Sequence, residues 1–422
     1  MNRIEEVAKE KVNTFYAQFK DENNVPHIFQ YPSPRPLLGN YMCVNKGRIL
    51  AACFKVDNIV IIRKNESDVS RFTYNGRMEK DDFHDLNGRQ DEFYTLKGLI
   101  RGILAKIYVD KNVIIPHFDL LVHKGDGLID DLLAYMIVDC LNRVFLSSEL
   151  KKDDILSIVD YACSKYAIIG CDTYLLNAID AKSLFILDYS KKREDAIIPL
   201  IYDMHDFDLF MLLPNHHYLD SSLIPHQKML EVAKYFDKNN LSELTFNDFV
   251  FSLSEKKMDY TLVLAAEHYF DESKNLNELT KELSKGNIKP FIDAFKSSAL
   301  TSTRYLGVVR PDSYVSFILN YLNSLPNSAC SIIGDDKAGY LISISHRGQN
   351  KDVLDYLERY VKEQYLFLDI DKEGIVKLFC DDKEPIITKE EEHKISHDEL
   401  LRAYKIERKK QRKRFSFLEE ID

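Results

Sequence analysis

The segment best suited to bind an anion is a short glycine-containing loop near residue 125. It reads His123-Lys124-Gly125-Asp126-Gly127 and follows an apolar run at 118–122 that predicts a β-strand. A long apolar stretch at 128–145 predicts a helix directly after the loop. The N-terminus of a helix offers free N–H groups and the positive end of the helix dipole. We therefore expect an anion site in this loop.

The cysteines and histidines show no spacing typical of a metal site. The chain has seven cysteines, an odd number with no CxxC pair, and most of them lie among apolar residues. We expect buried free thiols, and neither disulfides nor a zinc site. Three histidines lie close in sequence, at 216, 217 and 226, but their spacing matches no zinc pattern either. We therefore expect no metal site.

The net charge of −10 excludes a general affinity for nucleic acid, because a negative protein repels phosphates. One segment, 407–414, is strongly basic and reads Glu-Arg-Lys-Lys-Gln-Arg-Lys-Arg. It is either a solvated helical tail, as most charge runs are, or a contact for an acidic protein partner.

The length of 422 residues is enough for two domains with their own cores. The hydrophobic fraction of 45% and the charged fraction of 29% are typical of folded soluble proteins. No window approaches eighteen unbroken apolar residues, and the first six residues lack the apolar core of a signal peptide. We expect a cytoplasmic protein without a membrane span.

The apolar pattern predicts helices and strands in an α+β arrangement whose two halves divide near residue 200. Helices are expected at 4–20, 92–109, 128–145, 153–166, over most of 226–320, and at 351–365. Strands are expected at 49–54, 58–63, 118–122, 183–188 and 208–213, as a hairpin at 330–345, and as two strands at 366–379. Three prolines in the segment 31–36 predict irregular structure there.

Five segments, in order along the chain, resemble the galactokinase branch of the GHMP kinase superfamily. The first is 37–47, Leu-Leu-Gly-Asn-Tyr-Met-Cys-Val-Asn-Lys-Gly. It is similar to the sugar-binding signature of the family, G-R-V-N-L-I-G-E-H-T-D-Y-N-G-G. It keeps the apolar pair before Gly39, and it keeps Asn45 and Gly47.

This first resemblance implies that a sugar would contact Asn40, Tyr41 and Cys43. Asn40 and Cys43 stand where the family has two carboxylates that accept hydrogen bonds from sugar hydroxyls. Asparagine can still accept such a bond, but cysteine is a poor substitute. The catalytic arginine of the family aligns with Pro34, and a shift of one residue would place Arg35 there.

The second segment, 124–133, resembles the phosphate loop of the family, P-x-G-A-G-L-S-S-S-A-A. It is about three residues shorter, and Ile129, Asp130 and Asp131 replace the three serines. Serine hydroxyls suit phosphate oxygens and Mg²⁺, whereas two carboxylates would repel a triphosphate. We interpret Asp130 and Asp131 as helix N-cap residues. The degenerate phosphate-loop positions are Gly125, Asp126, Gly127, Asp130 and Asp131.

The third segment, Gly170-Cys171-Asp172-Thr173, precedes the expected strand that ends at Asp188. In the family, a G-I-M-D-Q segment here carries the aspartate that activates the sugar hydroxyl. The spacing from Asp172 to Asp188 fits the family without a gap. The resemblance implies that Asp172 is the catalytic base and a sugar contact. The alternative is that Asp172 caps a turn.

The last two segments retain less of the family pattern. Segment 217–228 resembles H-S-L-x-S-S-E-Y-P-V-R-R, with Ile224 in place of a tyrosine that contacts the sugar. Segment 330–340 resembles the glycine-rich loop A-R-M-T-G-G-G-F-G-G-C, but it gains side chains, and an ordinary hairpin turn explains it equally well. The positions in this degenerate glycine loop are Gly334, Asp335, Asp336, Lys337 and Gly339.

The resemblance covers roughly residues 8–380 and implies a two-domain GHMP-kinase-like fold. An N-terminal S5-like α/β domain would span 1–200, and a C-terminal ferredoxin-like α+β domain would span 201–385. A charged tail at 386–422 would follow. The implied activity of the family is phosphorylation of a sugar by ATP and Mg²⁺.

The degenerate motifs favour a protein that has lost, or nearly lost, this kinase activity. Such a pseudo-kinase would bind a sugar or a nucleotide as a sensor or regulator. One alternative is an active sugar-1-kinase of altered specificity, with Asp172 and Arg35 as catalytic residues and Lys124 or Lys337 supplying positive charge. The other alternative is an interaction scaffold that uses the basic tail.

Overall fold

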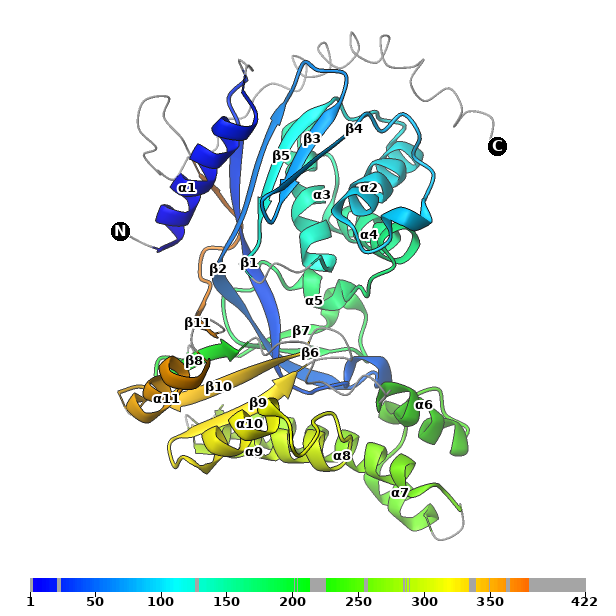
Figure 1. Ribbon diagram of the computed structural model, residues 1–422. Helices are drawn as coiled ribbons and strands as arrows, with labels where there is room; N and C mark the ends of the chain where they lie inside the picture. Colours follow the sequence, from blue (N-terminus) through cyan, green and yellow to red (C-terminus); the bar gives the residue numbers. More distant parts are fainter. Residues whose placement is uncertain are drawn as a thin grey trace. The chain divides into compact units, whose positions relative to one another are not determined.

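The computed structural model describes most of the chain as two compact units (Figure 1). Unit 1 comprises residues 1–33, 56–177 and 373–422, and unit 2 comprises 34–55 and 178–372. Two long strands, β1 (His27–Leu38) and β2 (Arg48–Lys64), begin in one unit and end in the other. The described residues are 3–20, 24–125, 129–200, 202, 204–212, 225–253, 257–283, 285, 287, 289–333, 339–348, 350–361 and 365–378.

Unit 1 contains a sheet with helices packed against it. The strand order is β4-β3-β5-β2, with β3 parallel to β5 and the other neighbours antiparallel. Helix α1 packs its apolar side on Ile59 and Ile61 of β2 and on Leu121 of β5. Helices α2, α3 and α4 form a separate group (Figure 1). The bounds are α1 Arg3–Gln18, β3 Ser70–Tyr74, β4 Arg77–Asp81, α2 Leu96–Lys111, β5 Phe118–His123, α3 Asp131–Phe145, α4 Lys152–Ala162, α5 Thr173–Asn177 and β12 Val376–Leu378.

Unit 2 contains an antiparallel sheet and most of the remaining helices. The strand order is β2-β11-β8-β10-β9, and β6 pairs with the first half of β2 and with β7. Helices α9 and α10 pack on β9, and α8 packs on α9 and α6. The bounds are β6 Phe185–Asp188, β7 Ile197–Pro199, β8 Phe207–Leu212, α6 Pro225–Tyr235, α7 Phe246–Ser252, α8 Tyr260–Leu283, α9 Lys289–Arg304, α10 Tyr314–Ser324, β9 Ser328–Ile333, β10 Tyr340–His346, α11 Lys351–Tyr356 and β11 Tyr365–Ile370.

The proline-rich segment 31–36 is part of β1, so the expectation of irregular structure there is wrong. The prolines alternate with other residues, at 32, 34 and 36. In a strand, the N–H groups of residues i and i+2 point to the same edge, so all three missing donors fall on one edge. The other edge keeps its donors. Strand β1 pairs with β12 and with β2.

Strand β2 is continuous, whereas the sequence predicts two strands separated by the more polar residues 55–57. These three residues are half-buried at the point where β2 changes partners. Lys55 pairs with β11, and Ile59 pairs with β5. Since both stretches remain hydrogen-bonded, the polar residues do not interrupt the strand.

The β3–β4 hairpin is not anticipated by the sequence interpretation, although the sequence carries its signal. Asn75 and Gly76 form the two-residue turn, and both have positive φ angles, 50° and 75°. An Asn-Gly pair between two extended segments is typical of such a turn.

Within the described ranges, no helix has the length and apolar character needed to cross a membrane.

A buried ion cluster holds α1 against the sheet of unit 1. The Asp119 carboxylate lies 2.9 Å from Arg63 Nε and 2.6 Å from Arg71 Nε, and the Asp119 side chain has no exposed surface. The Arg63 guanidinium in turn donates to the Phe19 carbonyl at the end of α1. The cluster therefore links β5, β2, β3 and α1 through one carboxylate.

We expect Asp119→Ala to lower the free energy of unfolding by about 3–5 kcal/mol, because it leaves the buried Arg63 without its counter-charge. Urea unfolding followed by circular dichroism measures the loss. Asp110→Ala, which removes a surface pair with Lys106, is the matched control and should cost no more than about 1 kcal/mol. Equal effects of the two substitutions would contradict a structural role for the cluster.

Candidate functional site

In the loop between β5 and α3, where the sequence predicts an anion site, the positive charge of Lys124 is paired with a carboxylate of the same chain. The Lys124 ammonium lies 2.8 Å from Asp130 Oδ2, and the Lys124 side chain has no exposed surface. Asp130 Oδ1 accepts a hydrogen bond of 2.9 Å from the Leu133 N–H. Asp130 is therefore the N-cap of α3, as the sequence predicts. A carboxylate of the protein already lies at the helix N-terminus, where an anion would otherwise bind.

The described part of the loop is also held from β2. The Gly125 N–H donates to Asn58 Oδ1 at 3.3 Å. The Asp57 carboxylate lies so close to Gly125 that a Cβ placed there would be 2.4 Å from Asp57 Oδ1. Asp126 and Gly127 lie outside the described residues. The backbone donor and the lysine in this loop thus both have partners within the chain.

Asp131 and Asp172 come together at the other side of the α3 N-terminus. Asp131 is not an N-cap, because it is the first residue of α3 and its Oδ2 accepts from the Asp172 N–H at 2.7 Å. Asp172 Oδ1 accepts from the N–H groups of Tyr174 and Leu175, at 3.1 and 3.0 Å. The capping role that the sequence leaves open for Asp172 is therefore observed, at the start of α5. Its role as a catalytic base stays a prediction.

The cysteines of the described ranges are free, and four of the six are buried. The exceptions, Cys43 and Cys171, are half-buried, and Cys380 lies outside the described residues. A hydrogen bond with the Cys163 thiol, burial and the Asp131 carboxylate raise the pKa of Cys171 well above its usual range. The described part of the chain contains no cluster of three or more His, Cys, Asp or Glu side chains that could hold a metal ion.

In unit 2, the segment from Gly39 to Gly47, called here the 39–47 loop, is a compact turn. Gly39 has φ +96°, and a Cβ there would lie 2.9 Å from both the Arg48 carbonyl oxygen and Ile49 Cα. Only glycine fits this approach without moving the backbone. The Met42 N–H donates to the Gly39 carbonyl, and the Gly47 N–H donates to the Met42 carbonyl. Gly39, one of the residues that carry the resemblance, thus has a structural reason in this chain.

The predicted sugar contacts in this loop differ in exposure. Asn40 is buried, with 4% of its surface exposed, whereas Tyr41 and Cys43 are half-buried. Asn45, retained from the signature, is buried, and its Oδ1 accepts from the Leu241 N–H at 3.3 Å. Two of the three predicted contacts therefore reach the surface of unit 2.

Arg35, the predicted catalytic arginine, lies on β1 near the start of β10. Its guanidinium carbon is 5.8 Å from the centre of the Tyr340 ring, and the Tyr340 hydroxyl donates to the Pro36 carbonyl at 3.2 Å. Gly339, from the degenerate glycine loop, precedes Tyr340 and is buried. The structure of unit 2 thus brings Arg35 close to one end of the glycine-loop segment.

Several predicted positions lie outside the described residues. These are Ile224, most of segment 217–228, the basic segment 407–414, and Gly334, Asp335, Asp336 and Lys337. The described site residues belong to different units. Gly125, Asp130, Asp131 and Asp172 are in unit 1, and Arg35, Asn40, Tyr41, Cys43 and Gly339 are in unit 2.

Two buried ionisable residues of α8, His268 and Glu272, were missed by the sequence interpretation. The His268 Nε2–H donates to the Asn40 carbonyl at 3.1 Å, and Glu272 Oε2 accepts from the Gly39 N–H at 3.1 Å. Burial lowers the pKa of His268 to about 4 and raises the pKa of Glu272 to about 7. Their spacing of four residues, on the same helix face as buried apolar residues, is the signal in the sequence.

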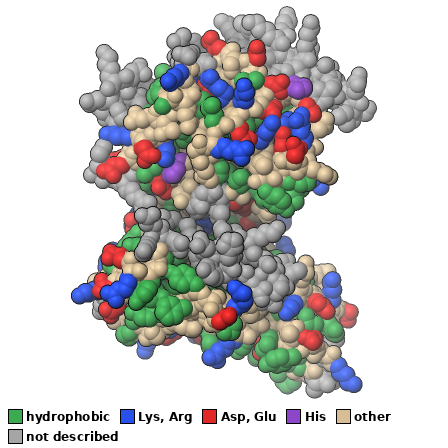
Figure 2. All heavy atoms as spheres, in the orientation of Figure 1, with side chains coloured by type: hydrophobic (Ala, Val, Ile, Leu, Met, Phe, Trp, Pro, Cys, Tyr) green, Lys and Arg blue, Asp and Glu red, His purple; other side chains and the backbone are tan. Residues whose placement is uncertain are grey.

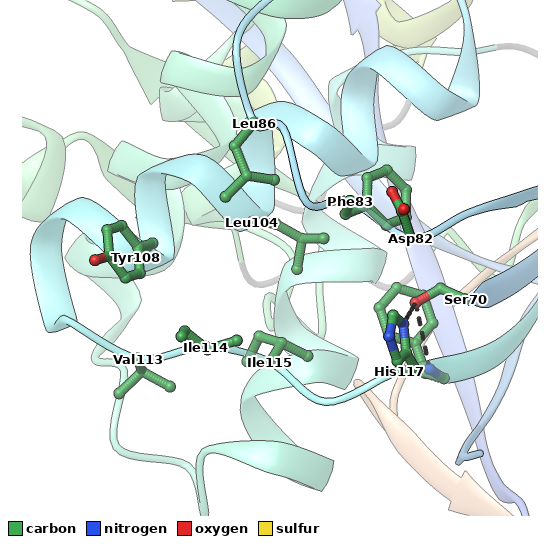
Figure 3. Close-up of a pocket in the computed structure, with 11 residues that line it drawn as sticks. Ser70, Asp82, Phe83, Leu86, Leu104, Tyr108, Val113, Ile114, Ile115 and His117 are labelled. Atoms are coloured by element: carbon green, nitrogen blue, oxygen red, sulfur yellow. Dashed lines mark hydrogen bonds between the residues drawn. The ribbon is translucent and has the colours of Figure 1, made fainter. Parts of the chain in front are cut away.

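Unit 1 also has a small hollow between β3 and α2 (Figure 3). Most of its lining is apolar, and the Ser70 hydroxyl and His117 Nδ1 lie 3.2 Å apart at its edge. Only about 10 Å³ of it can be occupied by the centre of a water molecule, which is room for about one water. In its present form it is too small for a sugar or a nucleotide.

Exposed apolar side chains gather on unit 2. Figure 2 shows hydrophobic side chains over α10, where Phe317 is 56% exposed. Phe251 of α7 is 78% exposed. Such surfaces favour packing against a partner, but they supply no groups for acid–base or phosphate chemistry.

Comparison with solved structures identifies the fold. No protein-family model and no curated protein sequence matches the chain. The galactokinase of Lactococcus lactis, solved in complex with galactose, has a TM-score of 0.71 at 15% identity, covering 87% of this chain and 99% of its own. The mevalonate kinase of Methanococcus jannaschii has a TM-score of 0.58 at 14% identity, covering 83% of this chain and 99% of its own. The predicted α+β GHMP kinase fold is confirmed, and at these identities the likeness extends to the fold alone.

The buried His268 gives a pH dependence with a definite sign. The unfolded chain takes up a proton near pH 6.5, but the folded state does so only near pH 4. The stability contributed by neutral His268 is therefore complete above pH 6.5 and is lost as the pH falls towards 4.

We expect His268→Gln to remove this loss, since the glutamine amide can still donate to the Asn40 carbonyl without titrating. The wild type should lose about 3 kcal/mol of stability relative to this variant between pH 6.5 and 4. Urea unfolding across that range measures the difference. His84→Gln, at an exposed histidine, is the control and should show no comparable change. Parallel pH curves for wild type and His268→Gln would contradict the prediction.

Proposed function

We propose that this protein is a sugar-binding pseudo-kinase with the GHMP kinase fold, which has lost or nearly lost phosphorylation by ATP. The observation that carries the proposal is the ion pair between Lys124 and Asp130 at the N-terminus of α3. Phosphoryl transfer depends on positive charge and N–H donors arranged around the phosphates. Here the lysine of the loop is buried against a carboxylate of its own chain.

The surroundings of this pair also argue against a bound triphosphate. Asp57, Asp130 and Asp131 bring three carboxyl groups to the loop and to the first turn of α3. At a partly desolvated site, each would repel the negative phosphates. The Gly125 N–H, a potential phosphate donor, already bonds Asn58. These contacts of the described residues support the proposed loss of ATP–Mg²⁺ binding in this loop.

The 39–47 loop supports the sugar-binding part of the proposal. Its backbone is fixed by Gly39, which tolerates no side chain. The Gly39 N–H also donates to Glu272, and His268 donates to the Asn40 carbonyl. Tyr41 and Cys43 of this loop are half-buried. Because the loop is already ordered, it loses little conformational entropy when a ligand binds to it. The similar galactokinase structure contains galactose, so galactose is the first sugar to test.

An active sugar-1-kinase of altered specificity is the second candidate. It is favoured by Arg35, which is only half-buried beside Tyr340, and by the match of Asp172 to the position of the family base.

An interaction scaffold that uses the basic segment 407–414 is a third candidate. Pull-downs with and without residues 386–422 would test that role.

We expect isothermal titration calorimetry to detect galactose binding and to find no ATP–Mg²⁺ binding tighter than about 1 mM, which is about −4.1 kcal/mol. Galactose-dependent release of ADP would contradict the pseudo-kinase and support the active kinase. Absence of binding by galactose and related sugars would contradict the sugar-binding part.

The double substitution Asp130→Ser and Asp131→Ser tests whether these two carboxylates cause the proposed loss of ATP–Mg²⁺ binding. Serine remains a good N-cap, so α3 should persist, while Lys124 loses its carboxylate partner. We expect ATP–Mg²⁺ to bind at least about tenfold more tightly, a gain of about 1.4 kcal/mol. Asp153→Ser, in the first turn of α4, is the matched control and should bind as the wild type does. An unchanged affinity in the double variant would show that the carboxylates do not exclude ATP.

A further inference from the structure

Two free cysteines of unit 1, Cys163 and Cys171, lie in contact where the chain leaves α4. Cys163 is the first residue of a π-helical turn that ends at Ala167, and Ile168 follows with a left-handed φ of 55°. The Ile169 N–H donates to the Cys163 carbonyl at 3.0 Å, so the chain folds back on the start of this turn. Two residues later, the Cys171 thiol is hydrogen-bonded to the Cys163 thiol.

The chain between the two thiols has room for the small movement that a disulfide requires. Two sulfur atoms that share a hydrogen are already in contact, and in a disulfide they lie about 2 Å apart. Next to Cys171, a Cβ placed on Gly170 would meet no atom of the described residues within 4 Å, apart from its chain neighbours. The backbone beside Cys171 can therefore shift without a clash.

The two thiols differ in their access to an oxidant. Cys163 is buried, with 0% exposed, whereas Cys171 is half-buried. Because one thiol donates to the other, the pair can carry one negative charge while the remaining proton is shared. The hydrogen bond with Cys163, burial and the Asp131 carboxylate hold the pKa of Cys171 well above its usual range. Oxidants attack the thiolate, so we expect a slow oxidation that becomes faster as the pH rises.

A movement of Cys171 acts directly on Asp172, the next residue of the chain. The Asp172 N–H donates to Asp131 Oδ2 at 2.7 Å. The Asp172 carboxylate accepts from the N–H groups of Tyr174 and Leu175 at the start of α5. A disulfide that draws Cys171 towards Cys163 therefore strains the bond between Asp172 and Asp131 first.

We propose that Cys163 and Cys171 form a reversible disulfide under oxidising conditions, and that this bond displaces Asp172 from Asp131. Transient disulfides of this kind serve as redox sensors in proteins whose thiols are otherwise reduced. The device concerns unit 1 alone and does not rest on the proposed function.

Hydrogen peroxide is the oxidant in this step. The pair first releases one proton, and the charge lies on Cys171 when the shared proton is on Cys163. The Cys171 thiolate attacks a peroxide oxygen, so that an S–O bond forms, the O–O bond breaks, and the leaving hydroxide takes up the released proton. The Cys163 sulfur then displaces hydroxide from this sulfenic acid, and its own proton completes a second water. The two thiols lose two electrons and two protons, and one peroxide becomes two waters.

Peptide mass spectrometry tests the bond in the reduced, unliganded full chain. The protein is treated with hydrogen peroxide, its remaining thiols are alkylated, and it is digested without reductant. We expect a peptide pair joined through Cys163 and Cys171, lighter by two hydrogen atoms than the free peptides and separated again by dithiothreitol. Its yield should rise between about pH 7 and pH 9, because the thiolate fraction rises.

Two substitutions make the assignment specific. Cys171→Ser should abolish the link, whereas Cys43→Ser, at another half-buried cysteine that belongs to unit 2, should leave it unchanged. Oxidation of Cys171 to a sulfinic acid without a link to Cys163 would overturn the proposal. The absence of any reaction at Cys171 across this pH range would overturn it as well.

Hydrogen exchange of the backbone amides tests the displacement in the wild type, so that no variant has to fold. We expect the Asp172 amide to lose about fivefold protection on oxidation, the effect of about one hydrogen bond, and to regain it with dithiothreitol. The Leu133 amide, which donates to Asp130 in the first turn of α3, is the control and should not change. Equal protection of Asp172 in both states would overturn the displacement.

Neither measurement contains a sugar or a nucleotide. A failure of the protein to bind galactose would therefore contradict the proposed function without touching this result.

Discussion

A charge or polar group taken out of water must find partners inside the protein, and both units are organised around groups under this constraint. In unit 1 the buried Lys124 is matched by Asp130, and the buried Asp119 is matched by two arginines. In unit 2 the buried Glu272 receives the Gly39 N–H. The pairing of Lys124 places a carboxylate of the chain at the N-terminus of α3, and the bond to Glu272 holds a loop that keeps Tyr41 and Cys43 half-buried.

The sequence predicts the parts of this structure that depend on neighbouring residues. The helix after the 123–127 loop, its cap at Asp130 and the fold class all follow from local patterns. The strand through 31–36 could not be anticipated by counting prolines, because only their alternation along one edge makes it possible. The continuity of β2 depends on pairing with β5, 54 to 64 residues away in the chain, and with β11, more than 300 residues away, and no local pattern contains these partners.

The residues of the candidate site also fall into two groups: some are recognisable from their own segment, and others depend on partners far away in the chain. Asp172 and Asp130 are recognisable from their own segments, although both also serve as caps. Glu272 was missed because its partner Gly39 lies 233 residues earlier in the chain. A carboxylate on the apolar face of a helix is visible in the sequence, but whether it meets a backbone N–H, a metal or a substrate depends on the tertiary fold alone.

The alternating prolines of β1 have a further consequence, which concerns aggregation. On the edge of the strand that carries residues 32, 34 and 36, the backbone offers carbonyl acceptors and no N–H donors. A second chain that approached this edge could not complete a hydrogen-bonded ladder with it. The segment also contains buried aromatic residues such as Tyr31, which would otherwise favour β-stacking of exposed chains during folding. The missing donors of residues 32, 34 and 36 thus disfavour intermolecular pairing along this edge of β1.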